Sequence, residues 1–135
     1  MEYVYPFCKF ENDIGKGEMY VIENNKQVIG SFVLSSFDDL EYHKIAWTLN
    51  NGKCFYINRL AISPMEQRKG YAKEAMKFII EYALNNKYDF IRLTVHEDNK
   101  YAIGLYEKFG FVRVEKGNWT LDDKIFVGFE MKLKK

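Results

Sequence analysis

Proline, glycine and cysteine are scarce in this sequence, and neither sign of charge is in excess. The chain of 135 residues has 2 prolines, 9 glycines and 2 cysteines, with 20 basic and 19 acidic side chains. A hydrophobic content of 47% with so few prolines and glycines excludes a disordered or low-complexity protein. A net charge of +1 lacks the basic excess with which nucleic-acid binders meet phosphate, so no nucleic-acid partner is expected.

Long hydrophobic runs and export signals are also missing. No stretch approaches the roughly 18 apolar residues of a membrane span, and the first residues, MEYVYPFCKF, do not resemble a signal peptide. Cys8 and Cys54 match no metal-ligand spacing, and in an unexported chain such thiols are reduced. The sequence therefore predicts one cytoplasmic globular domain over residues 1–135, with no metal and no membrane partner.

Hydrophobic periodicity predicts an α/β protein with a mixed sheet. We expect strands at 19–23 and 27–34 (a hairpin), 54–62, 90–96, 111–115 and 125–133, and helices up to residue 86 and over 99–109. Residues 1–10 show no clear period, and 35–52 are interpreted as a surface excursion. In the strand at 54–62, alternation predicts Phe55, Ile57 and Ala61 on one face. It predicts Tyr56, Leu60 and Ile62 on the other.

The segment 63–73 joins a buried strand to the longest helix and is the best candidate for a ligand site. The first N–H groups of a helix have no internal partner, and the helix dipole is positive there, so phosphate binds well. Gln67, Arg68 and Lys69 add donors and charge, and Gly70 allows a ligand to approach the backbone. The segment lacks the Lys-Ser/Thr pair of a P-loop and the three glycines of a dinucleotide site. By spacing alone, a phosphate site and an ordinary surface turn both remain open.

Two motifs give the chain a family resemblance. The segment QRKGYA at 67–72 fits the signature Q/R-x-x-G-x-G/A of the GNAT superfamily of acyl-CoA-dependent N-acetyltransferases. Asn99, Ala102 and the run LYEKFGF at 105–111 are similar to that family's N-x-x-A-x-x-L-Y-x-K-x-G-F segment. The strand at 56–62 and the hairpin at 19–34 also resemble the family, so the likeness covers about residues 13–132.

The resemblance implies a GNAT-like fold and an acyltransferase activity. The fold would be a mixed, mostly antiparallel sheet with helices on both faces. Family members begin with a strand and one or two helices, whereas about a dozen residues precede Asp13 here, so reduced N-terminal elements are expected. The implied reaction moves an acetyl group from acetyl-CoA to a primary amine by direct attack in a ternary complex. An exposed sheet edge at the start would invite strand pairing, so a homodimer is an expected assembly.

The resemblance also implies roles for individual residues. The coenzyme pyrophosphate would lie on the backbone N–H groups of 68–73, and the pantetheine arm would bond to the backbone of 60–62. The side-chain amide of Asn99 would hold the arm, and Tyr106 would act as general acid toward the departing sulfur. The implied cofactor-binding residues are Leu60, Ala61, Ile62, Gln67, Arg68, Lys69, Gly70, Tyr71, Ala72, Lys73 and Asn99.

The role of Tyr106 is chemically reasonable but has an alternative. A phenol of pKa ~10 is neutral at pH 7 and can give a proton to a thiolate of pKa ~8.5. Tyr106 also lies between Leu105 and Phe109, so it could equally be a core aromatic whose hydroxyl finds a partner.

The base that takes the proton of the attacking amine is not assigned. An alkylammonium has pKa ~10.4, so a base is expected, and His96, Glu97, Glu41 and His43 are candidates. Asp38, Asp39 and Glu41 could attract a cationic amine or be ordinary solvated residues. The aromatic residues that could line an acceptor cleft or simply pack are Phe37, Tyr42, Trp47 and Trp119. A rival interpretation is a non-catalytic acyl-CoA-binding module on the same fold.

Overall fold

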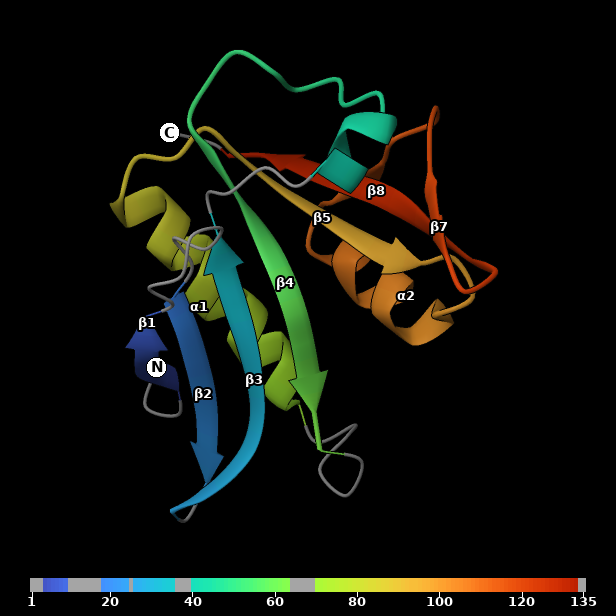
Figure 1. Ribbon diagram of the computed structural model, residues 1–135. Helices are drawn as coiled ribbons and strands as arrows, with labels where there is room; N and C mark the ends of the chain where they lie inside the picture. The colour runs from blue at the N-terminus through green and yellow to red at the C-terminus, as the bar shows by residue number, and fades with distance from the viewer. Residues whose placement is uncertain (1–3, 10–17, 25, 36–39, 64–69, 134–135) are drawn as a thin grey trace.

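The computed structural model describes residues 4–9, 18–24, 26–35, 40–63 and 70–133. Within these ranges one sheet contains eight strands, in the order β1-β2-β3-β4-β5-β8-β6 with β7 paired to β8 (Figure 1). The strands are β1 (Val4–Lys9), β2 (Glu18–Asn24), β3 (Gln27–Ser35), β4 (Cys54–Ile62), β5 (Phe90–His96), β6 (Val112–Arg113), β7 (Trp119–Leu121) and β8 (Lys124–Lys132). The helices are the 3-10 helix η1 (Leu40–Lys44), α1 (Tyr71–Asn85) and α2 (Lys100–Lys108).

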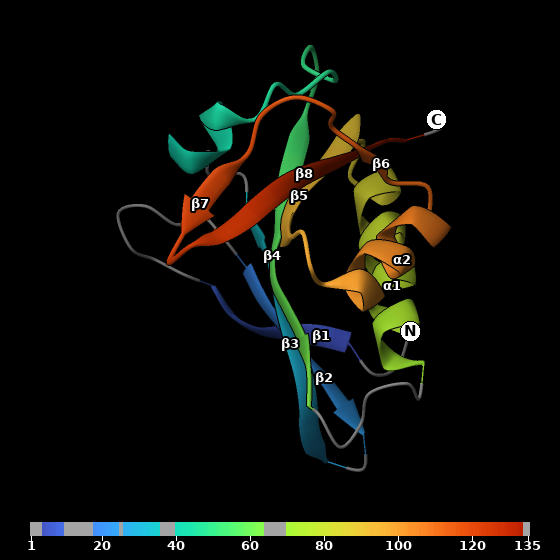
Figure 2. The ribbon, with the colours of Figure 1, turned by 90° about the vertical axis from the view of Figure 1, so that its right-hand side faces the viewer.

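The sheet is mixed and mostly antiparallel, as the resemblance implied. Only β4 and β5 pair in parallel, and every other neighbouring pair among the described strands is antiparallel. Both α-helices lie against one face, and the short helix η1 lies on the other (Figure 2). The hairpin, β4, β5, α1 and α2 all lie where the periodicity predicted them.

The core lies between the sheet and the two α-helices. Helix α1 turns a stripe of small and apolar side chains toward the sheet, because its apolar residues recur every three or four positions. Ile79 and Met76 are fully buried against Ile91 of β5 and Phe129 of β8 in one cluster. Burial of this stripe, at about 25 cal/mol per Å² of apolar surface, fixes α1 in place and with it the start of the helix.

The prediction for residues 35–52 was wrong in one respect. The segment from Tyr42 to Asn50 does not extend into solvent but covers the second face of the sheet. Tyr42 and Ile45 are 6% and 3% exposed, and the Trp47 ring and Ile45 pack directly over Gly128 of β8. These apolar residues follow no regular period, so periodicity could not reveal their burial.

Two short strands were not predicted, and one is shorter than expected. β1 pairs antiparallel with β2 across a register shift between Pro6 and Cys8, an irregularity that hides the period in the sequence. β7 reaches β8 through a turn in which Asp122 and Asp123 both have positive φ, 51° and 66°. β6 is only Val112–Arg113. Residues 10–17, between β1 and β2, lie outside the described part of the chain.

Candidate active site

The two central strands separate halfway along their length. β4 and β5 are paired from Cys54 and Phe90 to Ile57 and Leu93. Beyond that point β4 continues to Ile62 along β3, and β5 continues to His96 along β8. The facing edges of two parallel strands therefore diverge at the middle of the sheet, and backbone groups of β4 beyond Ile57 face this opening instead of β5 (Figure 1).

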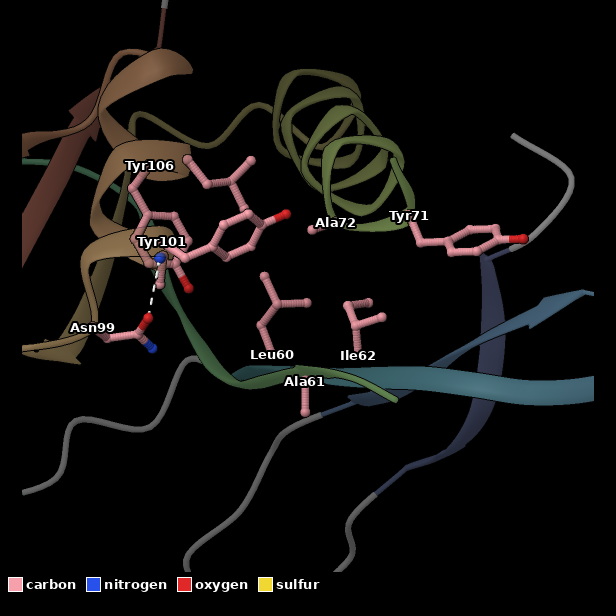
Figure 3. Close-up of a pocket in the computed structure, with 10 residues that line it drawn as sticks. Leu60, Ala61, Ile62, Tyr71, Ala72, Asn99, Tyr101 and Tyr106 are labelled. Carbon is pink, nitrogen blue, oxygen red and sulfur yellow. Dashed lines mark hydrogen bonds between the residues drawn. The ribbon is translucent and has the colours of Figure 1, made fainter. Parts of the chain in front are cut away.

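A β-bulge in β4 changes which side chains face the helices. Val33 of β3 is opposite Asn58, and Ser31 is opposite Ala61, so β4 holds one more residue than β3 in this interval. The predicted alternation was therefore wrong past the bulge, because an inserted residue reverses the faces. Leu60 and Ile62 pack against the helix-side core together with Phe55 and Ile57, whereas Ala61 is exposed and points away (Figure 3).

A cavity of about 360 Å³ lies where the strands diverge. β4 forms its floor, and the start of α1 and the inner side of α2 form its walls (Figure 3). It brings together Leu60, Ala61, Ile62, Tyr71, Ala72, Asn99 and Tyr106, all of which the resemblance had placed in one site. It is also lined by Ala102 and Leu105, which belong to the quoted motif but were given no role, and by Tyr101, which sequence reasoning did not single out.

The start of α1 has the backbone form of an anion site. Gly70 is its N-cap with φ +89°, no side chain caps the helix there, and a Cβ at Gly70 would meet nothing within 4 Å. Helical hydrogen bonding begins with the Glu74 N–H donating to the Gly70 carbonyl at 3.1 Å. The amides of Ala72 and Lys73 thus have no acceptor within the helix. Gln67, Arg68 and Lys69 lie outside the described residues.

The first turn of α1 is less purely basic than the sequence suggested. Because the helix begins at Tyr71, Glu74 falls in this turn. Its carboxylate is 3.9 Å from the Lys77 ammonium, and both side chains are exposed. Such an exposed pair contributes little to stability. The electrostatic potential at the start of α1 is therefore set mainly by the helix amides and the neighbouring lysines.

Asn99 is the N-cap of α2. Its Oδ1 accepts a hydrogen bond from the Ala102 amide at 3.1 Å (Figure 3). The backbone N–H of Asn99 donates to the His96 carbonyl at 2.9 Å. The side-chain carbonyl is therefore used by the helix, while the Nδ2 group remains as a donor beside the cavity.

Tyr106 is both a buried core aromatic and a residue that lines the cavity. Its ring is 7% exposed and packs near Phe111 and Phe129, with ring centroids 5.8 and 6.5 Å away. Tyr106 nevertheless lines the cavity. Burial raises the pKa of Tyr106 to about 12, because the tyrosinate would lose its hydration. The phenol therefore stays protonated, as a hydrogen-bond donor must.

Two lysines from different helices, Lys73 and Lys108, are neighbours. Lys73 is in the first turn of α1 and Lys108 in the last turn of α2. Contact with Lys73 and its positive charge lower the pKa of Lys108. Two adjacent ammonium groups create a local positive potential that favours an anion. Lys108 was quoted in the motif but was not given a role.

Among the candidates for a base, His96 and Glu97 lie near the end of β5. His96 alternates with Arg92 on the face away from the α-helices, and its Nε2 is 3.9 Å from Asp98 Oδ2. The Glu97 amide donates to the Ile125 carbonyl at 2.9 Å. His43 is exposed on η1, and the side chain of Glu41 is not among those described.

The aromatic residues that could have lined a cleft are mostly packed. The Tyr42 ring stacks on Tyr56 at 4.4 Å, and Trp47 meets Tyr56 edge-on at 6.1 Å. Trp119 stacks on Phe126 at 4.3 Å. Phe37, Asp38 and Asp39 lie outside the described residues.

The described residues contain neither a metal-binding cluster nor a membrane-spanning helix. In that part of the chain, no three His, Cys, Asp or Glu side chains are grouped so that they could hold a metal ion. None of its helices has the length and apolar character needed to cross a membrane.

Comparison with known proteins gives a consistent picture. The profile described as "Acetyltransferase (GNAT) family" matches residues 1–111. GCN5-related N-acetyltransferase 6, chloroplastic, of Arabidopsis thaliana is 33% identical over 73 residues, which are 53% of this chain and 25% of that protein. A crystal structure from Staphylococcus aureus, provisionally assigned as an acetyltransferase, has 29% identity and a TM-score of 0.68, covering 86% of this chain and 72% of that one.

A second solved structure of similar fold contains acetyl-CoA. A GNAT family acetyltransferase from Elizabethkingia anophelis with acetyl-CoA bound has 19% identity and a TM-score of 0.66, covering 87% of this chain and 76% of that one. The chain belongs to the acetyltransferase (GNAT) family. It spans about a quarter of the length of the Arabidopsis relative.

Proposed function

We propose that the protein transfers an acetyl group from acetyl-CoA to a primary amine by direct attack in a ternary complex. The observation that carries this proposal is the cavity at the divergence of β4 and β5. Tyr71 and Ala72 at the start of α1 line it, and Tyr106 of α2 lines it as well. Membership of the acetyltransferase (GNAT) family supports the same reaction.

The coenzyme would be held along the length of the cavity. The pyrophosphate would bind at the start of α1, on amides from residue 68 to Lys73 beside Gly70. The pantetheine arm would follow the backbone of 60–62, where the edge of β4 is not paired with β5. The Asn99 Nδ2 group would donate to a carbonyl of the arm. Among the described residues, the groups that support this proposal are the amides of Ala72 and Lys73, the edge of β4 beyond Ile57 and the Asn99 side chain.

The chemistry needs one group that donates and one that accepts a proton. The amine nitrogen attacks the thioester carbonyl carbon, a C–N bond forms, and the C–S bond breaks. The departing sulfur takes a proton or a strong hydrogen bond from the Tyr106 hydroxyl. The amine gives its proton to a base or to water, and His96 and Glu97 on the acceptor side remain the candidates for this base.

The outer edge of the sheet bears on assembly. β1 is the end strand of the sheet among the described strands, so its far edge has no partner within them. An edge of this kind can pair with a second copy of the chain. We therefore include a homodimer in the proposal, and sedimentation showing only monomers at high concentration would argue against it.

The test combines binding with thiol release. Wild type should bind acetyl-CoA in calorimetry and release free thiol with at least one amine from a panel of spermidine, an aminoglycoside, lysine and short peptides. Tyr106→Phe should bind acetyl-CoA normally and release thiol at least about tenfold more slowly, in the range of general acid catalysis. Tyr88→Phe, a substitution of the same chemistry outside the cavity, is the control. Binding without thiol release across the panel would instead support a non-catalytic acyl-CoA module.

A further inference from the structure

The sequence contains one Asn-Gly pair, Asn51-Gly52, and it lies in the connection from η1 to β4. Both residues are exposed and belong to no helix or strand. Asn51 lines an open hollow beside Asp89 and Phe90, and Figure 1 shows the connection (teal to green) passing the end of the sheet at which β4 begins. The cavity of the candidate active site lies beyond Ile57, at the other end of β4.

The two groups that can react with each other in this pair are both free. The side-chain carbonyl carbon of an asparagine is open to attack by the backbone nitrogen of the next residue. A glycine at that next position has no Cβ to hinder the approach. Within the described residues, neither the Asn51 side-chain amide nor the Gly52 N–H has a hydrogen-bond partner. Nothing in this part of the chain therefore holds the reacting atoms apart.

The preceding asparagine shows the opposite situation. Asn50 Nδ2 donates to the Trp47 carbonyl at 2.7 Å, and its Oδ1 accepts from Arg92 Nη2 at 3.0 Å. Both ends of this amide are held, so its carbonyl carbon cannot turn toward the next backbone nitrogen without breaking two hydrogen bonds. The structure thus protects Asn50 and leaves Asn51 unprotected.

We propose that Asn51 is a site of spontaneous deamidation, at which the chain is converted into aspartate and isoaspartate forms. The Gly52 nitrogen forms a bond to Asn51 Cγ, the bond from Cγ to Nδ2 breaks, and the proton lost by the glycine nitrogen leaves with Nδ2 as ammonia. Water then opens the resulting succinimide ring. Cleavage of the bond from the ring nitrogen to Cγ gives aspartate, and cleavage of its bond to the main-chain carbonyl carbon gives isoaspartate. Water is the co-reactant, and the inference is independent of the proposed function.

The isoaspartate product would not fit this connection well, because it adds a methylene group to the main chain between two anchored points. Asn50 is one anchor. The other is Lys53, whose N–H donates to Asp89 Oδ2 and whose carbonyl accepts from the Asp89 amide, both at 2.7 Å. A Cβ on Gly52 would already lie 2.8 Å from Asp89 Oδ2, so the backbone has little room to shift. The lengthened chain must strain or release an anchor, whereas the aspartate product adds only a charge.

The experiment ages the full chain in mildly alkaline buffer, both native and in urea, and follows each asparagine by mass spectrometry of peptides. The Asn51 peptide of the native protein should gain about one dalton at a rate within roughly threefold of that in urea, because exposed connections open at almost no cost in free energy. Asn50 should stay unmodified in the native protein. Asn51→Gln is the matched control and should show neither the mass gain nor an additional acidic band in isoelectric focusing. A native Asn51 that stays intact while it reacts in urea, or that reacts in neither, would overturn the inference.

A second measurement tests the strain in the isoaspartate form. The protease Asp-N cleaves before aspartate and not before isoaspartate, so it identifies the two products after they are separated. The urea midpoint of the isoaspartate form should be lower than that of Asn51→Asp, which carries the same added charge on a main chain of normal length. Equal midpoints would refute the strain between Asn50 and Lys53. Acetyl-CoA binding and thiol release in freshly prepared protein test the proposed function separately, so neither result depends on the other.

Discussion

Arg92 of β5 donates from Nη1 to the hydroxyl of Tyr56 of β4 at 2.7 Å, in the paired part of the two central strands. Its other contacts hold residues 47–50 against the face of the sheet opposite the α-helices. Nη2 donates to the Leu49 carbonyl at 2.9 Å and to Asn50 Oδ1 at 3.0 Å, and the guanidinium carbon lies 4.8 Å from the Trp47 ring centre. The buried Arg92 side chain therefore connects β5 both to β4 and to residues 47–50, which cover the second face of the sheet.

The cross-strand neighbour of Arg92 completes this attachment. Glu130 of β8, opposite Arg92, is 5% exposed and accepts from the amides of Thr48 and Leu49 at 3.2 and 3.1 Å. The Thr48 hydroxyl also donates to this carboxylate. A buried positive and a buried negative group on adjacent strands therefore hold the same short segment by its backbone.

Replacing Arg92 with methionine should destabilise the protein strongly. The Tyr56 hydroxyl and the Leu49 carbonyl would lose a charged donor while remaining buried, which costs about 3 kcal/mol. Urea denaturation followed by tryptophan fluorescence measures this free energy. Arg113→Met, on the exposed face of β6, is the control and should change the stability by less than about 0.5 kcal/mol. Equal stability of the two variants would show that the Arg92 network contributes little.

The raised pKa of Tyr106 predicts a difference in alkaline stability. Burial raises the folded-state pKa of Tyr106 to about 12, above the ordinary value near 10. The unfolded state loses this proton first, so the stability that neutral Tyr106 contributes is complete below pH 10 and is lost as pH rises through 12. The lost amount is about 3 kcal/mol for a shift of this size.

Tyr106→Phe lacks this titration and should lose less stability than wild type between pH 10 and 12. Other groups that titrate in this range are common to both proteins, so the difference between their urea midpoints isolates residue 106. Parallel curves for the two proteins would mean that the phenol ionises as easily in the folded as in the unfolded protein.

The sequence allowed the regular elements to be predicted because their signals are local. The strand at 90–96 has apolar residues at every second position, the helix α1 has them at every third and fourth, and the strand at 54–62 is a largely apolar run. Leu60 was misplaced because its apolar character suits either face, and only the pairing with β3 reveals the extra residue. Arg92 was not expected in the interior because its partners lie some 40 residues away in the chain.

The candidate site was predictable in a different way. Asn99, Tyr106 and the residues around Gly70 were found through a family signature, since spacing alone left an ordinary turn equally open. Tyr101 carried no such signal, because an exposed tyrosine on a helix is unremarkable until a cavity is seen beside it. Lys108 needed the contact with Lys73, which depends on how two helices meet.

Asn99 should have two separable roles, in folding and in binding. Asn99→Ala removes the hydrogen bond to the Ala102 amide and should cost about 1 kcal/mol of stability. Asn99→Asp keeps a capping oxygen and suits the positive end of the helix dipole, so its stability should match wild type. Asp has no Nδ2 donor, so the affinity for acetyl-CoA in calorimetry should still fall several-fold. Unchanged affinity in Asn99→Asp would remove Asn99 from the cofactor site while leaving its capping role intact.

Substitution of Gly70 separates charge from backbone strain at the start of α1. A side chain at φ +89° costs roughly 1–2 kcal/mol, although the space around its Cβ is open. Gly70→Gln and Gly70→Glu share this strain and nearly the same bulk, so their stabilities should be similar. Only glutamate places a negative charge beside the proposed pyrophosphate. Calorimetry should therefore find acetyl-CoA binding at least about tenfold weaker in Gly70→Glu than in Gly70→Gln, a ratio that shrinks at high salt as charge is screened. Equal binding by the two variants would place the pyrophosphate elsewhere.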